Sequence, residues 1–172
     1  MYIQNNVFKK SPPYTLEAIP TGRAGIKKTL SIMADLVNRS KKTPRIREFT
    51  RDLVQHLNQK DIYGEVKTVF KFVRDNIRYI KDIRDIETLH TPEKILEQKA
   101  GDCDDKSMLV AAMLESIGYE CRFVAVGWST NKLSHVFTQV KLRGKWITLE
   151  TTEPWSMGKT SPGISDQMIQ II

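Results

Sequence analysis

The chain is poor in cysteine: only two occur among its 172 residues, at positions 103 and 121. Two cysteines cannot form the disulfide framework of a small secreted domain. The first fourteen residues lack the apolar stretch of a signal peptide, so we expect reduced thiols in the cytoplasm. Long apolar runs are also missing, because the longest, such as 123–126, have the length of a strand. We therefore expect no membrane span.

The composition predicts one globular domain. Hydrophobic residues make up 40% of the chain and charged residues 27%, which excludes a fibrous or a disordered protein. A chain of this length can bury a substantial core.

Positive charge is concentrated in the first third of the chain. Residues 1–60 hold twelve Lys or Arg against four Asp or Glu, a net charge of +8, whereas the remainder holds 15 against 16, a net charge of −1. A solvated helical face is the simplest interpretation of this region. Docking to a larger protein assembly is an alternative, and nucleic acid is a partner that we do not favour.

Local patterns divide the chain into four segments. The prolines within residues 1–20 predict an extended arm, because proline fixes φ. Apolar residues then recur at helical spacing from Thr21 onward. We divide the domain into the extended arm (1–20), a basic helical region (21–60), a catalytic core (61–153) and a C-terminal tail (154–172), whose short apolar end gives no clear pattern.

The periodicity of the catalytic core changes along the chain. Helical spacing predicts helices between residues 21 and 76, a short helix after Thr91, and a strong helix over 103–117. Alternating patterns then predict three strands at 121–126, 135–142 and 145–149. Helices followed by strands favour an α+β fold, in which an antiparallel sheet packs on the central helix that carries Cys103.

Cys103 is the candidate nucleophile. It lies in the run Gly101-Asp102-Cys103-Asp104-Asp105-Lys106-Ser107, at the first turn of the strong helix, where backbone amides and the helix dipole favour a thiolate. The same amides can stabilise the oxyanion that forms when a thiolate attacks an amide carbonyl. A small buried structural cysteine is the alternative, and the flanking glycine and acidic residues argue against it.

His135 is the candidate general base. A thiol nucleophile needs an imidazole within hydrogen-bonding reach. We interpret His56, in a predicted helix, and His90, in a loop, as surface or capping residues. His135 instead opens a strand after the polar loop 129–134, so we expect it at the rim of a cleft.

Glu150 is the candidate acid that orients the imidazole. A hairpin that turns at Arg143-Gly144 returns the chain to His135 near residues 149–151. Glu153 is close enough in sequence to compete for this role. Tyr79, Asp102 and Trp128 are tentative substrate-binding residues, although Tyr79 is also interpreted as a core residue.

Four sequence runs resemble the transglutaminase-like superfamily of papain-type enzymes. They are the Cys103 motif, Ser134-His135-Val136-Phe137, the run from Gly144 to Thr152, and the upstream run from Val73 to Tyr79. The resemblance covers about residues 62–153. It implies Cys103 as nucleophile, His135 as base and acid, and Glu150 as orienting acid, where the family more often has aspartate. It implies no cofactor.

Small phage or bacterial relatives of this kind favour a cysteine peptidase or amidase that acts on a protein or peptide through a thioester. Transfer of the acyl group to an amine, by a transglutaminase, remains an alternative, as does a non-catalytic module in a phage virion or other assembly. A phage origin would place the protein in the host cytoplasm or the virion. A metal site at Cys103, its neighbouring aspartates and His135 matches no closed zinc pattern.

Overall fold

A computed structural model describes residues 18–81, 88–130 and 132–172 of the chain. The arm expected over residues 1–20 therefore lies almost entirely outside the described residues. The elements follow the chain in this order: α1 (Gly22–Ser40), α2 (Pro44–Val54), α3 (Ile62–Asn76), β1 (Arg78–Tyr79), α4 (Pro92–Gln98), β2 (Ala100–Gly101), α5 (Cys103–Ser116), β3 (Cys121–Gly127), β4 (His135–Leu142), β5 (Lys145–Leu149) and β6 (Asp166–Ile171).

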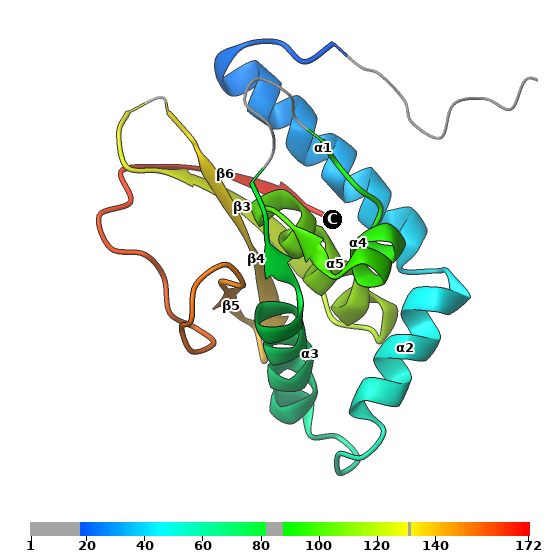
Figure 1. The fold of residues 1–172 in the computed structure, drawn as a ribbon. Coiled ribbons are helices and arrows are strands. Elements are labelled where there is room, and N and C mark those ends of the chain that lie inside the picture. The colour runs from blue at the N-terminus through cyan, green and yellow to red at the C-terminus, as the bar shows by residue number, and fades with distance from the viewer. Residues whose placement is uncertain (1–17, 82–87, 131) are drawn as a thin grey trace, which may run out of the picture.

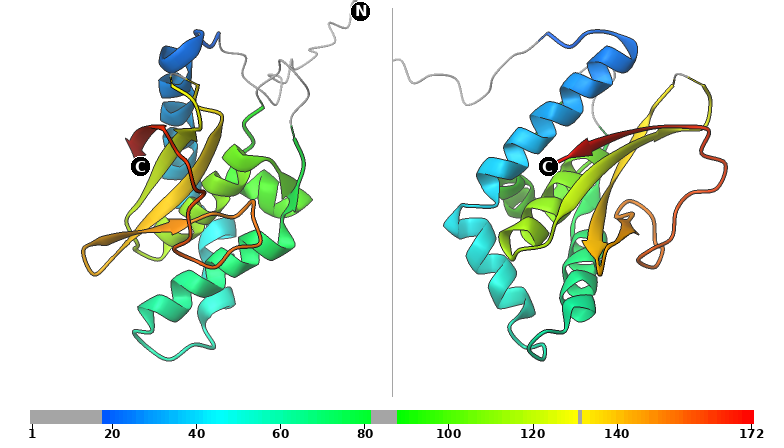
Figure 2. Two further views of the ribbon diagram at one scale, coloured as in Figure 1. Left: turned by 90° about the vertical axis from the view of Figure 1, so that its left-hand side faces the viewer. Right: turned by 180° about the vertical axis from the view of Figure 1, so that it is seen from behind.

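The fold is α+β, as the order of patterns predicts. Strands β3 to β6 form an antiparallel sheet in the order β5-β4-β3-β6. Helix α5 lies between this sheet and the other helices, and it contacts β3, β4 and each of α1 to α4 (Figures 1 and 2). The opposite face of the sheet carries a small apolar cluster of Val124, Val126 and Phe137, which Ile164 covers.

Helix α5 is buried on all sides over most of its length, from Asp105 to Leu114. Such a helix needs apolar residues around its whole circumference. The stretch from Met108 to Leu114 supplies them, and all seven residues have 0% exposure. The core therefore holds α5 rigidly, and its first turn reaches the end of the sheet at which β4 begins.

Two side-chain hydrogen bonds fix α5 against β4. Ser107 Oγ donates to the carbonyl oxygen of Val136 at 3.3 Å, and Thr138 Oγ1 donates to the carbonyl oxygen of Ser107 at 2.9 Å. Both bonds are buried, so water competes little for them. They fix the position of the first turn of α5 relative to the first residues of β4.

A short parallel ladder joins β1 to β2, with Tyr79 opposite Gly101. Next to it, the buried Lys106 donates from Nζ to the carbonyl oxygens of Ile77 at 2.7 Å and Arg74 at 3.3 Å. These carbonyls belong to the end of α3 and the residue after it. Lys106 therefore ties α3 and β1 to the helix that carries Cys103.

Local details differ from the sequence-based expectations in a few places. Thr91 caps α4 by accepting from the Lys94 amide, but Thr43 makes no such bond at α2 and instead donates to Glu93. Helix α2 ends at Val54, so His56 follows the helix rather than lying in it. The tail supplies strand β6, which pairs with β3.

In the described ranges, none of the helices combines the length and the apolarity that crossing a bilayer requires.

Candidate active site

Cys103 is the first residue of α5, and Asp102 is its N-cap. Oδ1 of Asp102 accepts hydrogen bonds from the amides of Asp104 at 3.0 Å and Asp105 at 3.2 Å. The cap therefore engages two of the first-turn amides that the sequence suggested for an oxyanion site. Asp102 therefore caps α5, and the substrate-binding role suggested for it remains a prediction.

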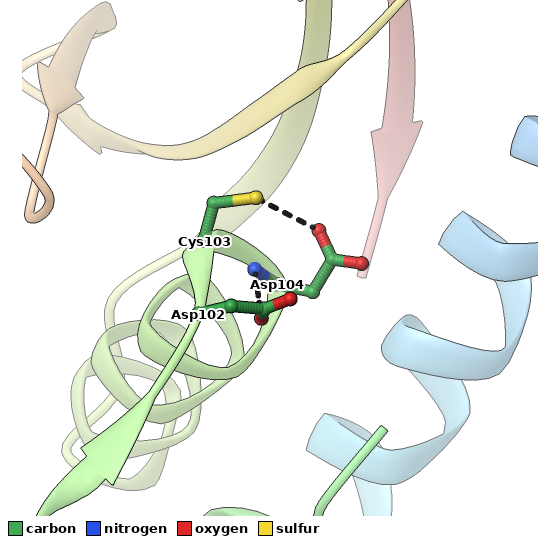
Figure 3. Close-up of side chains that lie close together, drawn as sticks. All are labelled: Asp102, Cys103 and Asp104. Carbon is green, nitrogen blue, oxygen red and sulfur yellow. Dashed lines mark hydrogen bonds between the residues drawn. The ribbon is translucent and has the colours of Figure 1, made fainter. Parts of the chain in front are cut away.

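The electrostatics of the thiol differ from the sequence-based expectation. Burial raises the pKa of Cys103 well above the ordinary value, and the charges of Asp104 and Asp102 raise it further. The Val136 amide hydrogen-bonds to the sulfur and opposes this shift. The thiol donates to Oδ1 of Asp104 at 3.5 Å, and Figure 3 shows the two groups pointing toward each other. The helix N-terminus lowers the thiol pKa less than burial and the two carboxylates raise it.

His135 and Glu150 form a hydrogen bond of 2.6 Å between Nε2 and Oε2. The register explains this contact: Thr138 pairs with Leu149, so the next residue, Glu150, lies beside Phe137 on the face that carries His135. Glutamate has one more methylene group than aspartate, and this length lets Glu150 reach from beside Phe137 to His135, two residues away on β4. Glu153, the competing candidate, is exposed and outside this contact.

Thr152 fixes the other oxygen of the Glu150 carboxylate. Its amide donates to Oε1 at 2.9 Å and its hydroxyl donates to the same atom at 2.7 Å. Burial by itself would raise the pKa of Glu150, but the hydrogen bonds from His135 and Thr152 and the charge of His135 outweigh burial and lower it. The carboxylate is therefore ionised at neutral pH and holds one orientation.

Trp128 and Phe137 flank the imidazole of His135, with ring centroids 6.2 Å and 6.4 Å from it. Trp128 is 46% exposed, and its Nε1 donates to the carbonyl oxygen of Pro162 at 3.0 Å. It therefore forms part of the rim beside His135. A substrate contact at Trp128 remains a prediction.

Cys103 and His135 line the same cavity, which has a volume of about 540 Å³. The residues around its sulfur end are Asp102, Cys103, Asp104, Ser134, His135 and Val136. Among the hydrogen bonds of the described residues, the thiol pairs with Asp104 and the imidazole pairs with Glu150. The two reactive groups thus share a cavity without a direct bond between them in this state.

Tyr79 is 42% exposed, so its interpretation as a core residue is wrong. Partial burial and the nearby charges of Asp102 and Asp104 raise the pKa of the phenol to about 12. Tyr79 therefore keeps its proton at neutral pH and remains a hydrogen-bond donor near the thiol.

Several supporting residues carry weak or no sequence signals. Thr152 follows Glu150 by two residues, a spacing at which a threonine commonly hydrogen-bonds locally, and could have been noticed. His90 donates its amide to Oδ1 of Asp105 at 3.1 Å, and its Nδ1 lies 3.0 Å from Oδ2 of that buried carboxylate. That pair anchors the chain before α4 to the first turn of α5, and only the fold reveals it.

Within the described part of the chain, one group of side chains could offer ligands to a metal ion. One atom each from Asp102, Cys103 and Asp104 lie within 4.8 Å of one another. Oδ1 of Asp102 already accepts two amides, and Oδ1 of Asp104 accepts the thiol. A hard cation would favour the carboxylate oxygens and not the sulfur. This donor set therefore indicates no particular metal.

Three solved structures illustrate the likeness in fold. LapG of Legionella pneumophila, in an EGTA-treated form, is 16% identical with a TM-score of 0.54, and the match covers 77% of each chain. A Cytophaga hutchinsonii protein, provisionally named a cysteine protease, is 13% identical with a TM-score of 0.56 over 82% of this chain and 55% of that one. A chain of the Rad4–Rad23 complex bound to a 6-4 photoproduct UV lesion is 14% identical with a TM-score of 0.52 over 78% of this chain and 40% of that one.

At these identities the likeness concerns the fold, and this chain spans about half the length of the Cytophaga protein. No curated protein matches the sequence significantly. The family itself is shown by sequence, because the family model of the transglutaminase-like superfamily matches residues 48–151, which is more than half of the chain. The chain belongs to the transglutaminase-like superfamily.

Proposed function

We propose that the protein is a cysteine peptidase or amidase that hydrolyses an amide bond of a protein or peptide through a thioester. The observation that carries this proposal is the 2.6 Å hydrogen bond between His135 and the buried Glu150, at a cavity that His135 shares with Cys103. A buried carboxylate that orients an imidazole beside a thiol is the arrangement that nucleophilic catalysis requires.

The Glu150 contact determines the tautomer of His135. An ionised carboxylate only accepts hydrogen bonds, so Nε2 of the imidazole must carry the proton that points to Glu150. In the neutral ring this leaves Nδ1 unprotonated. Nδ1 is then the atom that accepts the proton of the Cys103 thiol.

The proposed reaction conserves every proton. His135 Nδ1 takes the thiol proton while Cys103 sulfur bonds to the carbonyl carbon of the substrate, and the imidazolium is stabilised by Glu150. When the C–N bond breaks, the imidazolium returns that proton to the departing amine, which leaves a thioester on Cys103. Water then attacks the thioester and gives its proton to His135. The acid product departs, and the sulfur regains the proton.

The resting thiol is neutral because burial and two carboxylates disfavour the thiolate. The proton is therefore expected to move during attack rather than before it, in contrast to a preformed ion pair. Closer approach of Cys103 and His135 when a substrate displaces water from the cavity would assist this transfer.

Fewer hydrogen-bond donors are available to the oxyanion than the free backbone amides of a helix N-terminus would supply. The Asp102 side chain occupies the amides of Asp104 and Asp105. The amide of Cys103 itself and the phenol of Tyr79 are the donors that we assign to the oxyanion. Tyr79 suits this role because its proton stays on the oxygen up to high pH.

Two alternatives remain, each with its own support. The thioester could pass to an amine instead of water, since both acceptors would use the same groups on the protein. A non-catalytic module is supported by the Cys103–Asp104 pairing and by the raised thiol pKa. Such a module would dock on a phage virion or another assembly through the basic helices α1 and α2.

A reducing compartment suits the proposed chemistry, since Cys103 must remain a thiol between turnovers. We therefore place the activity in the cytoplasm, which would be the host cytoplasm for a phage protein.

The first test is the pH dependence of Cys103 alkylation by iodoacetamide, followed by mass spectrometry in the native protein and in His135→Ala. Cys121, fully buried in β3, serves as the internal control. We expect His135→Ala to slow alkylation of Cys103 at neutral pH at least several-fold. Equal rates in both proteins would favour the non-catalytic module. New peptide termini, as opposed to amine incorporation with ammonia release, would then distinguish hydrolysis from transfer.

A further inference from the structure

The cavity beside Cys103 has one wall that lies outside the matched family segment. Helix α1 and the residues before it supply that wall, whereas the family match begins at residue 48. The apolar residues of this wall are Ile19, Pro20, Ile26, Leu30 and Met33. Cavities of about 540 Å³ fall in the range that accommodates small ligands or a few side chains.

Two contacts hold this wall in place. Arg23 of α1 forms a 2.6 Å ion pair with Asp166 of β6, and α1 also packs on β6 and α5. The chain before the helix folds back on its first turn: a Cβ atom on Gly25 would lie 1.9 Å from the carbonyl oxygen of Pro20 and 3.2 Å from Cγ2 of Ile19. Only glycine permits this close approach, which keeps Ile19 at the cavity.

Charge in the cavity is distributed unevenly. The two carboxylates, of Asp102 and Asp104, lie at the sulfur end, where they accept backbone amides and the thiol. The α1 wall presents mainly aliphatic carbon, including Ile19, which is 40% exposed. Lys132, an exposed residue of the loop before His135, also lines the cavity and carries a positive charge. An acidic side chain would meet two negative charges at the sulfur end and apolar carbon at the α1 wall. An aliphatic side chain would bury its surface against the wall and gain the hydrophobic free energy.

We propose that the α1 wall is the specificity subsite of the enzyme and that it selects substrates with an aliphatic side chain, such as leucine, beside the scissile amide. The inference rests on the proposed function, because it assigns a substrate class to the same thiol. It makes Ile19 and Ile26 specificity-determining residues, although neither lies in the segment that matches the family.

Dipeptidyl acyloxymethyl ketones test this subsite without knowledge of the natural substrate. Cys103 sulfur displaces the carboxylate from the methylene carbon of such a probe and forms a thioether, which intact mass spectrometry detects. Three probes carry leucine, lysine or aspartate at both side-chain positions. We expect the leucine probe to label Cys103 at least ten-fold faster than the aspartate probe, with the lysine probe between them.

Ile19→Asp is the test variant, because an exposed residue can be replaced with little risk to folding. Ile169→Asp is the matched control: Ile169 lies on β6, is 43% exposed and does not line the cavity. We expect Ile19→Asp to slow the leucine probe about ten-fold more than it slows iodoacetamide, since that reagent is too small to contact α1 and reports only the effect of the new charge on the thiol. Ile169→Asp should match the native protein with every probe.

Equal labelling by the three probes, or an unchanged leucine rate in Ile19→Asp, would overturn the subsite while the thiol chemistry stands. If the proposed function itself is wrong, the experiments give a different result. In that case no probe labels Cys103, and His135→Ala leaves the iodoacetamide rate unchanged.

Discussion

The thiol of Cys103 lies 3.5 Å from Oδ1 of Asp104, the residue that follows it on α5. A carboxylate at this distance favours the protonated sulfur by charge and by hydrogen bonding. The motif therefore places the nucleophile at a helix end and, in the next position, a group that keeps it protonated.

Replacing Asp104 by asparagine should increase the reactivity of Cys103. The substitution removes a negative charge that raises the thiol pKa, so the pKa should fall. Because a lower pKa increases the thiolate fraction at a given pH, alkylation of Cys103 by iodoacetamide at pH 8 should accelerate several-fold. Asp35→Asn, on the exposed face of α1, is the control and should leave the rate unchanged. An unchanged rate in Asp104→Asn would mean that burial and the charge of Asp102 set the pKa without Asp104.

Thr152→Val should weaken the assistance that His135 gives to the thiol. The variant removes the 2.7 Å hydroxyl bond to Glu150 Oε1 and keeps the amide bond. One hydrogen bond to a charged group contributes about 1.5–3 kcal/mol, part of which orients the carboxylate. We expect a roughly ten-fold slower labelling of Cys103 by the leucine probe, with recovery in Thr152→Ser. Equal rates in both variants would show that the amide alone holds Glu150.

Glu150 should make stability depend on acid pH. Its pKa is lower in the folded than in the unfolded state, so its contribution to the free energy of unfolding is complete above the unfolded pKa and is lost as the pH falls through the folded pKa. Glu150→Gln should cost about 1–3 kcal/mol at pH 7, where the ionised group is stabilised by its hydrogen bonds. The difference between the two proteins should shrink at pH 3 in urea unfolding experiments. A difference independent of pH would place the loss in packing instead.

Lys106→Ala should destabilise the junction between α3 and α5. The variant leaves two carbonyl acceptors, of Ile77 and Arg74, without the buried ammonium and opens a space in the core. Unpaired buried polar groups and lost packing together predict a loss of about 2–4 kcal/mol in the free energy of unfolding. Lys94→Ala, at an exposed surface pair, should change it by less than about 1 kcal/mol. Equal losses in the two variants would contradict this role for Lys106.

The sequence predicted the α+β architecture, and the structure confirms it. Strands β4 and β5 were predicted with the same bounds that the structure shows, because their alternation and the Arg143-Gly144 turn are local signals. The hairpin geometry also pointed to Glu150 as the partner of His135, and the hydrogen bond between them is present. The catalytic roles of these residues and of Cys103 stay predictions.

Other features depend on contacts between distant segments and could not be derived from local patterns. The pKa of Cys103 reflects burial by the whole fold in addition to its position on the helix. Strand β6 has weak local signals and exists because it pairs with β3. The participation of α1 in the cavity likewise depends on its packing against α5 and β6.

The ion pair between Arg23 and Asp166 joins two residues that are 143 positions apart. During synthesis on a ribosome, α1 emerges first, whereas the strand that supports it emerges only after Cys103 and His135. The cavity wall therefore lacks its support on β6 while the rest of the site can already fold. We expect a nascent chain to acquire its substrate selectivity last, after the segments that carry the thiol and the imidazole have been synthesised.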